Sequence, residues 1–351
     1  MDLINISQTA LMIIIGTIGL ALFGILFGLV YKGIDRKLAA HMQGRIGPPI
    51  RQPFLDVAKL FTKENIVPEN AVPWVFNLAP LVGLVAAISI LLYMPLGGFA
   101  PLLSNMGDLI LILYLLIIPS LAMVIGGFAS GSPYATVGAQ REMTTMIAYE
   151  FPFAIIIISI AWKLSLDGVT NVFALSSIAS APVWNTAGPI GFIGFMILLL
   201  ALIIVTPAEL SKIPFDSPEA ESEIAGGLLV EYSGRNLAMF YLTDGVKTVV
   251  MASLIIALFF PYNLSPLFGL GSYPAFAVDI VFYLVKVFLV ILFSVTLIRV
   301  AVARLKIDQI VYTYWVPLTL LSLVGLICIM WDQTIMANFG LQPVFEMLGL
   351  I

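Results

Sequence analysis

Between Asp2 and Lys32 the chain carries no charged side chain. A helix crosses the hydrocarbon core of a bilayer in about 20 residues, so this run predicts a membrane span at residues 9–31. A secretory signal peptide is a poorer interpretation, because the apolar run is too long, no basic segment precedes it and further spans follow. The N-terminal run therefore favours a membrane protein.

The rest of the sequence repeats this pattern. Only 10% of the residues are charged and 61% are apolar, whereas ordinary soluble domains carry about 25% charged residues. The same length criterion predicts about eight spans. They lie at residues 9–31, 73–94, 108–129, 143–163, 189–207, 236–260, 278–299 and 310–331. The expected fold class is therefore all-α, that of a polytopic membrane protein.

One further helix is expected at residues 53–63, outside the spans. Its residues are amphipathic, which is typical of a helix that lies in the membrane interface. The apolar face holds Phe54, Val57, Ala58, Leu60 and Phe61. We therefore expect about eight transmembrane helices plus one interfacial amphipathic helix.

The positive charges predict the orientation, because short cytoplasmic loops collect Lys and Arg. All 16 Lys and Arg residues except Lys163, Lys247 and Lys286 fall in four alternate loops. We expect these loops inside the cell membrane and both termini outside. No loop is long enough to fold separately, so residues 1–351 are expected to form a single transmembrane domain with cytoplasmic loops 32–72 and 208–235.

Composition excludes several classes of function. The net charge of −4 leaves no basic surface of the kind that binds nucleic acid. Zinc, iron–sulfur and nickel sites need several thiolate or imidazole ligands, and the chain has only Cys328 and His41. We therefore expect no metal on this chain, and any redox centre must lie on a partner subunit.

Carboxylates crowd the segment between the fifth and sixth spans. They are Glu209, Asp216, Glu219, Glu221, Glu223 and Glu231. One interpretation is a solvated acidic loop. The interleaved apolar residues favour a segment folded against the helices, where crowded carboxylates repel one another, acquire raised pKa values and can pass protons.

Further charges lie inside the predicted spans. Glu150 lies seven residues into the fourth span, Asp244 and Lys247 share one face of the sixth and could pair, and Asp279 and Lys286 share one face of the seventh. Ionisable residues inside a membrane are costly and mark functional sites. Ion pairs that fix helix register are the alternative, but strung together these groups favour a proton path entering from the cytoplasmic loop.

Several motifs resemble those of the subunit 1 (or H) family of respiratory complex I. The acidic segment carries its signature: Ala208-Glu209, Pro214-Phe215-Asp216, Glu219-Ala220-Glu221-Ser222-Glu223 and Glu231-Tyr232. The resemblance extends over most of the chain, through Gly44-Arg45-Ile46-Gly47-Pro48, the Asp56 to Lys59 segment, and Arg141 with Ala148-Tyr149-Glu150. The family fold is an eight-helix bundle, which agrees with the count of spans.

The resemblance implies roles for particular residues. In complex I, members of this family form part of the quinone chamber and begin the polar axis toward the antiporter-like subunits. The implied chamber and proton-path residues are Glu209, Asp216, Glu219, Glu221, Glu223, Glu231 and Glu150. The implied contacts with the peripheral arm, through loops 32–72 and 208–235, are Arg45, Arg51, Asp56, Lys59 and Arg141.

One segment departs from the quinone-reducing form. Complex I versions run Gly-Pro-Asn-Arg followed by a longer loop, whereas this chain runs Gly47-Pro48-Pro49-Ile50-Arg51-Gln52-Pro53. The shorter form is similar to the membrane subunit of energy-converting, ferredoxin-linked NiFe-hydrogenases and their sulfur-reducing relatives, and it argues against a bound quinone. The implied function is that of a non-catalytic subunit that anchors a peripheral redox arm and couples its chemistry to proton or sodium translocation.

The implied partners are peripheral redox subunits that hold iron–sulfur clusters, with a NiFe centre in the hydrogenase form, and antiporter-like membrane subunits. Two alternatives stay open. The first is the quinone-chamber subunit of a complex I-type NADH or ferredoxin:quinone oxidoreductase. The second is an independent secondary transporter, against which the sequence has no inverted repeat of broken helices. The coupling ion and the terminal electron acceptor also stay open.

Overall fold

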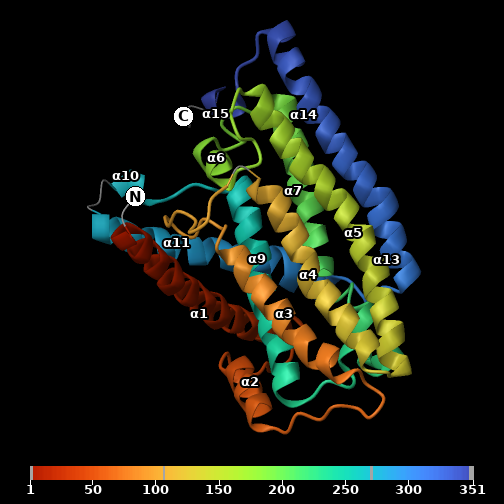
Figure 1. Cartoon of the computed structure of the whole chain (residues 1–351). Helices are drawn as coiled ribbons and strands as arrows, with labels where there is room; N and C mark the ends of the chain where they lie inside the picture. The colour runs from red at the N-terminus through yellow and green to blue at the C-terminus, as the bar shows by residue number, and fades with distance from the viewer. Residues whose placement is uncertain (1–2, 106, 269–271, 348–351) are drawn as a thin grey trace.

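The computed structural model describes residues 3–105, 107–268 and 272–347, which are helical and contain no strand beyond one isolated bridge between Leu96 and Phe99. Eight helices of this described part are long and apolar enough to cross a membrane. The prediction of an all-α, polytopic membrane protein is therefore confirmed (Figure 1).

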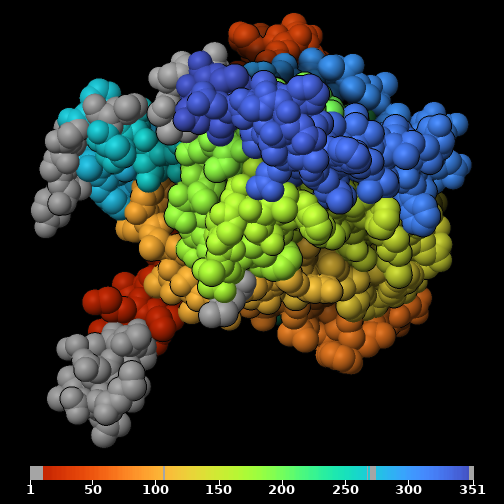
Figure 2. Space-filling model, turned by 90° about the horizontal axis from the view of Figure 1, so that it is seen from above, coloured from red at the N-terminus to blue at the C-terminus, as the bar shows by residue number. Residues whose placement is uncertain are grey.

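Six spans are continuous helices and two contain a five-residue π-helical segment. The continuous spans are α1 (Leu3–Met42), α3 (Pro73–Leu91), α4 (Asp108–Ala129), α5 (Pro133–Leu166), α7 (Pro189–Glu209) and α9 (Gly234–Phe259). The seventh joins α11 (Ser272–Ile291) to α12 (Leu297–Ala301) through Leu292–Thr296, and the eighth joins α13 (Ile307–Thr313) to α14 (Thr319–Phe339) through Tyr314–Leu318. The helix α14 packs against α7, and Figure 2 shows the blue C-terminal part of the chain beside the green part.

The remaining helices are short. They are α2 (Gln52–Thr62), α6 (Leu175–Ser180), α8 (Glu221–Ile224), α10 (Ser265–Phe268) and α15 (Val344–Met347), with 3-10 turns at Ser217–Glu219 and Gly227–Leu229. Pro73, Pro133 and Pro189 open α3, α5 and α7, where a missing N–H costs nothing because the first turn has no acceptor for it.

The predicted boundaries were wrong for the fourth span. We expected residues 143–163, but α5 begins at Pro133 and includes Arg141 and Glu142. A hydropathy criterion places the end of a span at its first charged residues. The helix nevertheless continues through Arg141 and Glu142, because their side chains bind polar groups such as Glu223 and Ser211. Glu150 consequently lies near the middle of α5 rather than two turns from its start.

The helix α9 forms the centre of the bundle. Of its most apolar 18-residue window, 94% is buried, against 17% for α1, and α1, α3 and α11 pack around α9 (Figure 1). The crossing of α1 and α9 is very close, because a Cβ atom on Gly28 would lie 2.5 Å from the Gly245 carbonyl oxygen. This contact requires glycine and brings the residues one turn after Gly28 against those beside Gly245.

The amphipathic helix was predicted correctly in position. In α2 the buried residues are Pro53 and Val57, which face α1 and α9. Ala58 and Phe61, on the predicted apolar face, are exposed on the chain, as is Leu55. A single helix resting on two others buries a narrow stripe of i and i+4 positions, so the other apolar side chains face outward.

Candidate functional site

A polar cavity of about 410 Å³ lies where α1, α7 and α9 meet the segment between α7 and α9. We call this the charged end of the bundle, and the cavity the inner cavity. Twelve of its 21 lining residues are charged: Lys32, Asp35, Arg36, Glu209, Lys212, Asp216, Glu219, Glu221, Asp244, Lys247, Arg299 and Arg304. Six are acidic and six are basic, so the formal charge of the lining is zero when all of them are ionised.

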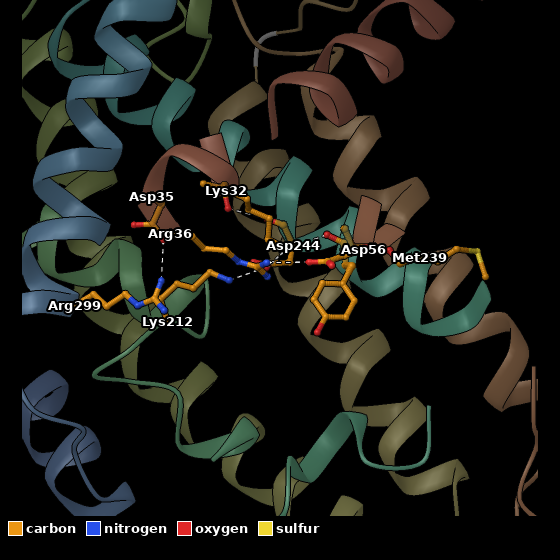
Figure 3. Close-up of polar contacts among 11 residues, drawn as sticks. Lys32, Asp35, Arg36, Asp56, Lys212, Met239, Asp244 and Arg299 are labelled. Atoms are coloured by element: carbon orange, nitrogen blue, oxygen red, sulfur yellow. Dashed lines mark hydrogen bonds and ion pairs between the residues drawn. The ribbon is translucent and has the colours of Figure 1, made fainter. Parts of the chain in front are cut away.

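Asp244 stands at the centre of this network and binds two lysines (Figure 3). One Asp244 carboxylate oxygen lies 2.5 Å from the Lys32 Nζ and 2.6 Å from the Lys212 Nζ. The Lys32 ammonium also donates to the Tyr241 carbonyl at 3.0 Å. The close crossing of α1 and α9 at Gly28 and Gly245 brings Lys32 next to Asp244, because Lys32 lies one helical turn after Gly28 on α1. The expected pair of Asp244 with Lys247 is therefore not formed.

Lys247 pairs instead with Glu209, the last residue of α7. The Lys247 Nζ lies 2.8 Å from Glu209 Oε1, and the two side chains are 4% and 3% exposed. The ammonium also donates to the Ser120 hydroxyl at 2.8 Å. This pair lies deeper than the lysines on Asp244, yet both residues still line the inner cavity. Buried charges of this kind stay ionised only while they remain paired.

Three acidic or phenolic groups on α5 lie near this buried pair. Glu142 is 1% exposed and accepts a 3.4 Å hydrogen bond from the Ser211 hydroxyl. The Tyr149 phenol interacts with the Glu209 carboxylate, and Glu150 interacts electrostatically with both Glu209 and Lys247. The buried pair and the acids of α5 therefore form one electrostatically coupled group.

Glu142 was not identified from the sequence. It was counted as part of a loop, because the predicted span began at residue 143. The available signal was its spacing: Glu142 precedes Glu150 by two turns, so both lie on one side of α5 once the helix extends through them.

The acidic segment between α7 and α9 is folded against the helices rather than solvated. Asp216 receives two hydrogen bonds from Arg304, at 2.9 and 2.6 Å, and Glu223 pairs with Arg141 at 2.5 Å. Burial raises the pKa of Glu219 to about 7 against the opposing effect of the Lys212 charge. Burial lowers the pKa of Lys212 and the Asp244 carboxylate raises it, with a net upward shift.

The other members of the segment are more loosely held. Glu221 is exposed at the edge of the inner cavity, and Glu231 is half-buried. Asp35, which was not singled out from the sequence, accepts hydrogen bonds from Thr296 at 2.7 Å and Arg299 at 2.9 Å. Thr296 belongs to the π-helical segment of the seventh span, so that segment contacts the cavity wall directly.

The residues expected to contact partner subunits fall into two groups. Asp56 binds Arg36 at 3.0 Å and Gln52 at 2.9 Å (Figure 3), and Arg141 is held by Glu223. Arg45, Arg51 and Lys59 are exposed on the loop and on α2. Asp56 and Arg141 therefore form ion pairs within the chain, whereas the charged side chains of Arg45, Arg51 and Lys59 are exposed on the surface.

Asp279 and Lys286 do not join this site. Asp279 accepts hydrogen bonds from the backbone of Leu264 and Ser265 and from the Ser265 hydroxyl. Lys286 donates to the carbonyls of Phe260 and Tyr262, just beyond the end of α9. Both residues lie at the opposite end of the bundle, where they satisfy backbone groups.

Other buried charges also hold helix ends. Asp332 accepts hydrogen bonds from the Gly188 and Gly191 amides at the start of α7, and Lys163 pairs with Asp167 at 3.2 Å. Within the described residues, no group of three or more His, Cys, Asp or Glu side chains could hold a metal ion. The inner cavity is thus the place where titratable groups gather.

Comparisons with known proteins place this geometry in a family context. A model of the NADH dehydrogenase family matches residues 15–330. The H subunit of the NADH-quinone oxidoreductase of Brevibacillus brevis is 35% identical over 302 residues, covering 84% of this chain and 85% of that protein. The H subunit of the F420H2 dehydrogenase of Methanosarcina mazei is 31% identical over 331 residues, covering 89% and 91%.

A solved structure is also similar. A chain of the membrane-bound sulfane sulfur reductase, an archaeal respiratory membrane complex, superposes with a TM-score of 0.78 at 29% identity. The match covers 90% of the present chain and 99% of the other. The three similar proteins differ in the electron carrier or acceptor in their names, while the membrane fold is shared.

Proposed function

We propose a function for this chain from the premise that it belongs to the NADH dehydrogenase family, the family of subunit 1 of complex I. It is a multi-pass membrane subunit of a redox-driven, ion-translocating complex. Within that complex, we infer that it anchors the peripheral redox arm and couples electron transfer there to ion movement. The observation that carries this inference is the buried Lys247–Glu209 pair at the inner cavity.

The coupling mechanism is electrostatic. Glu219 lies outside the spans and titrates near pH 7, so a change in charge on the arm alters its protonation. Its charge acts on Lys212, which shares Asp244 with Lys32. A weaker ion pair between Lys212 and Asp244 changes the electrostatic field at the neighbouring Lys247–Glu209 pair. That pair in turn acts electrostatically on Glu142 and Glu150, whose protonation then changes. These steps change the charge or the local field at neighbouring side chains and require no large movement of helices.

The peripheral arm is proposed to dock on loops 32–72 and 208–235. Arg45, Arg51 and Lys59 are exposed and can contact the arm. Asp56 and Arg141 stabilise the conformation of the docking surface through ion pairs within the chain. The proposed partners are redox subunits with iron–sulfur clusters, and antiporter-like membrane subunits beside the bundle. In this orientation the charged end faces the cytoplasm and both termini lie outside.

The proposed redox chemistry of the complex is that of a ferredoxin-linked hydrogenase or sulfur-reducing enzyme. Two observations support it: the short segment from Gly47 to Pro53, and the similarity to the sulfane sulfur reductase. Twelve of the 21 residues that line the inner cavity are charged, and buried charges of this kind require polar partners. Water and protons can supply such partners.

A quinone-reducing complex is the second candidate, favoured by the names of similar relatives such as the Brevibacillus brevis protein. The experiment that separates the two is purification of the intact complex through a tag on this chain, followed by metal analysis and assays with reduced ferredoxin. We expect iron, together with hydrogen evolution when nickel is present, or sulfide production when it is absent. Reduction of a quinone analogue by the purified complex would overturn this assignment in favour of the second candidate.

A further inference from the structure

A second cavity, which we call the outer cavity, lies at the end of α9 opposite the charged end. Its volume is about 390 Å³, within the range of about 300–1,000 Å³ that is typical of pockets for small molecules. Its walls come from four parts of the chain: the loop at residues 95–101, α6, the end of α9 with the residues that follow it, and α11. The coupling scheme above makes no use of this cavity.

The position of the outer cavity in the fold is at the boundary of the membrane. The loop at residues 95–101 joins α3 to α4, and α6 lies between α5 and α7, so both connect spans on the side opposite the charged end. The span α9 ends at Phe259, just before the lining residues Pro261 and Asn263. Tyr262, between them, is 37% exposed, and tyrosine is enriched where lipid headgroups lie. Lipid molecules therefore have direct access to this cavity.

The lining of the outer cavity is mostly apolar and carries a single charge. Among the fifteen described residues that line it, only Lys286 is charged. Most of the others are apolar or glycine, including Phe99, Pro101, Ile256 and Ala257. Apolar walls favour a ligand that buries hydrocarbon, and the ammonium favours an anion. One positive charge beside an apolar wall therefore matches an amphiphile with an anionic head.

The charge of Lys286 is not neutralised by an ion pair within the described residues. Its Nζ donates to the neutral carbonyls of Phe260 at 3.0 Å and Tyr262 at 2.8 Å, which leaves one of its three N–H groups for a ligand. Asp279 attracts Lys286 electrostatically, but both Asp279 oxygens accept hydrogen bonds from Leu264 or Ser265, and Asp279 does not line the cavity. An anion in the cavity would supply the missing partner.

We propose that the outer cavity binds an anionic phospholipid, with its phosphate on the Lys286 ammonium and one acyl chain along the apolar wall. Basic pockets between transmembrane helices bind anionic lipid headgroups in other proteins. Ser176 and Asn263 line the same cavity and are exposed, so they can bond phosphate or glycerol oxygens. The inference goes beyond the proposed function, because it does not depend on the redox reaction or on the ion that is moved.

The lipid stabilises the packing of α11 and the loop at residues 95–101 around the end of α9. The helix α11 packs against α9, and Gly97 of the loop approaches α11 so closely that a Cβ atom there would lie 3.1 Å from the Ile280 Cα atom. A hollow between these elements forfeits van der Waals contacts of its walls. An acyl chain restores them, while the phosphate bonds the lysine that links α11 to the residues after α9.

Binding is tested with the intact complex in detergent, washed free of lipid and titrated with phosphatidylglycerol, with bound lipid counted by native mass spectrometry. Lys286→Met removes the charge at similar length, and we expect the tightest binding step to weaken at least tenfold. Lys37→Met, which removes an exposed lysine of α1 at the charged end, is the matched control and should leave this step unchanged. Wild-type affinity in Lys286→Met would overturn the proposal.

The apolar half of the site is tested with the charge left in place. Ala257, 3% exposed, lines the cavity from α9, and Ala257→Leu narrows the space for an acyl chain. We expect the same binding step to weaken at least fivefold in this variant, with recovery of the assembled complex as the control for folding. Unchanged affinity in assembled Ala257→Leu would contradict the placement of the acyl chain and overturn the proposal.

The class of ligand is tested by thermal stability of the washed complex. We expect phosphatidylglycerol to raise the apparent melting temperature by about 3 °C or more, and we expect phosphatidylcholine to have no such effect at the same concentration. Equal protection by inorganic phosphate would show a site for a free anion, and equal protection by phosphatidylcholine would show that charge does not select the ligand. Either result would overturn the proposal and leave the proposed function unaffected, because neither electron transfer nor ion movement is measured.

Discussion

Replacing Lys247 with Met tests the energetic weight of the buried pair. The substitution leaves the Glu209 carboxylate, 3% exposed, without its partner at 2.8 Å and leaves the Ser120 hydroxyl without the ammonium. Removing one member of a buried ion pair typically costs about 3–5 kcal/mol. Because Glu142 adds a second acidic group nearby, we expect a cost in this range, seen as a large fall in the thermal stability of the purified complex.

The double variant Lys247→Met, Glu209→Gln supplies the decisive comparison. It removes both charges at similar volume, so most of the lost stability should return, since isosteric replacement of a whole buried pair is often close to neutral. Thermal unfolding of the wild type, both single variants and the double variant gives the coupling energy. Additive losses, with the double variant less stable than either single variant, would refute the reasoning that the two charges sustain each other.

Three further predictions follow from individual contacts. Glu150→Gln should leave assembly intact while slowing or uncoupling ion movement, and full coupled activity in the assembled variant would contradict its role. Glu219 has its folded pKa raised to about 7 from 4.5, so folding binds a proton between these values and its contribution to stability falls as pH rises through this window; Glu219→Gln should flatten that slope in unfolding measured from pH 5 to 8. Gly28→Leu should prevent assembly, measured by recovery of the complex on a tag, because even a Cβ atom there meets the Gly245 carbonyl oxygen at 2.5 Å; normal recovery would show that α1 and α9 can separate without loss.

The spans could be predicted because each is a long apolar segment, and the requirement for internal backbone hydrogen bonding in lipid leaves few other structures. The start of α5 could not, since whether Glu142 continues a helix depends on Ser211 and the other polar groups around it, which belong to a distant part of the chain. Local hydropathy carries no information about such neighbours.

The partners of the buried charges could not be predicted from local sequence either. Sequence spacing placed Asp244 and Lys247 on one helix face, but each found a partner on another helix or segment. The crossing at Gly28 and Gly245 decides this, and two glycines in separate spans do not reveal from the sequence that they touch. The acids of the segment after α7 were identified from their motif, whereas the basic residues that hold them in place became visible only in the folded chain.

The most direct test of the account is the number of ions translocated per electron by the intact complex in sealed vesicles, compared between the wild type and the double variant Lys247→Met, Glu209→Gln. The account predicts that the double variant assembles and transfers electrons, but that its ratio of ions to electrons falls at least tenfold. An unchanged ratio would contradict the claim that this buried pair couples redox chemistry to ion movement.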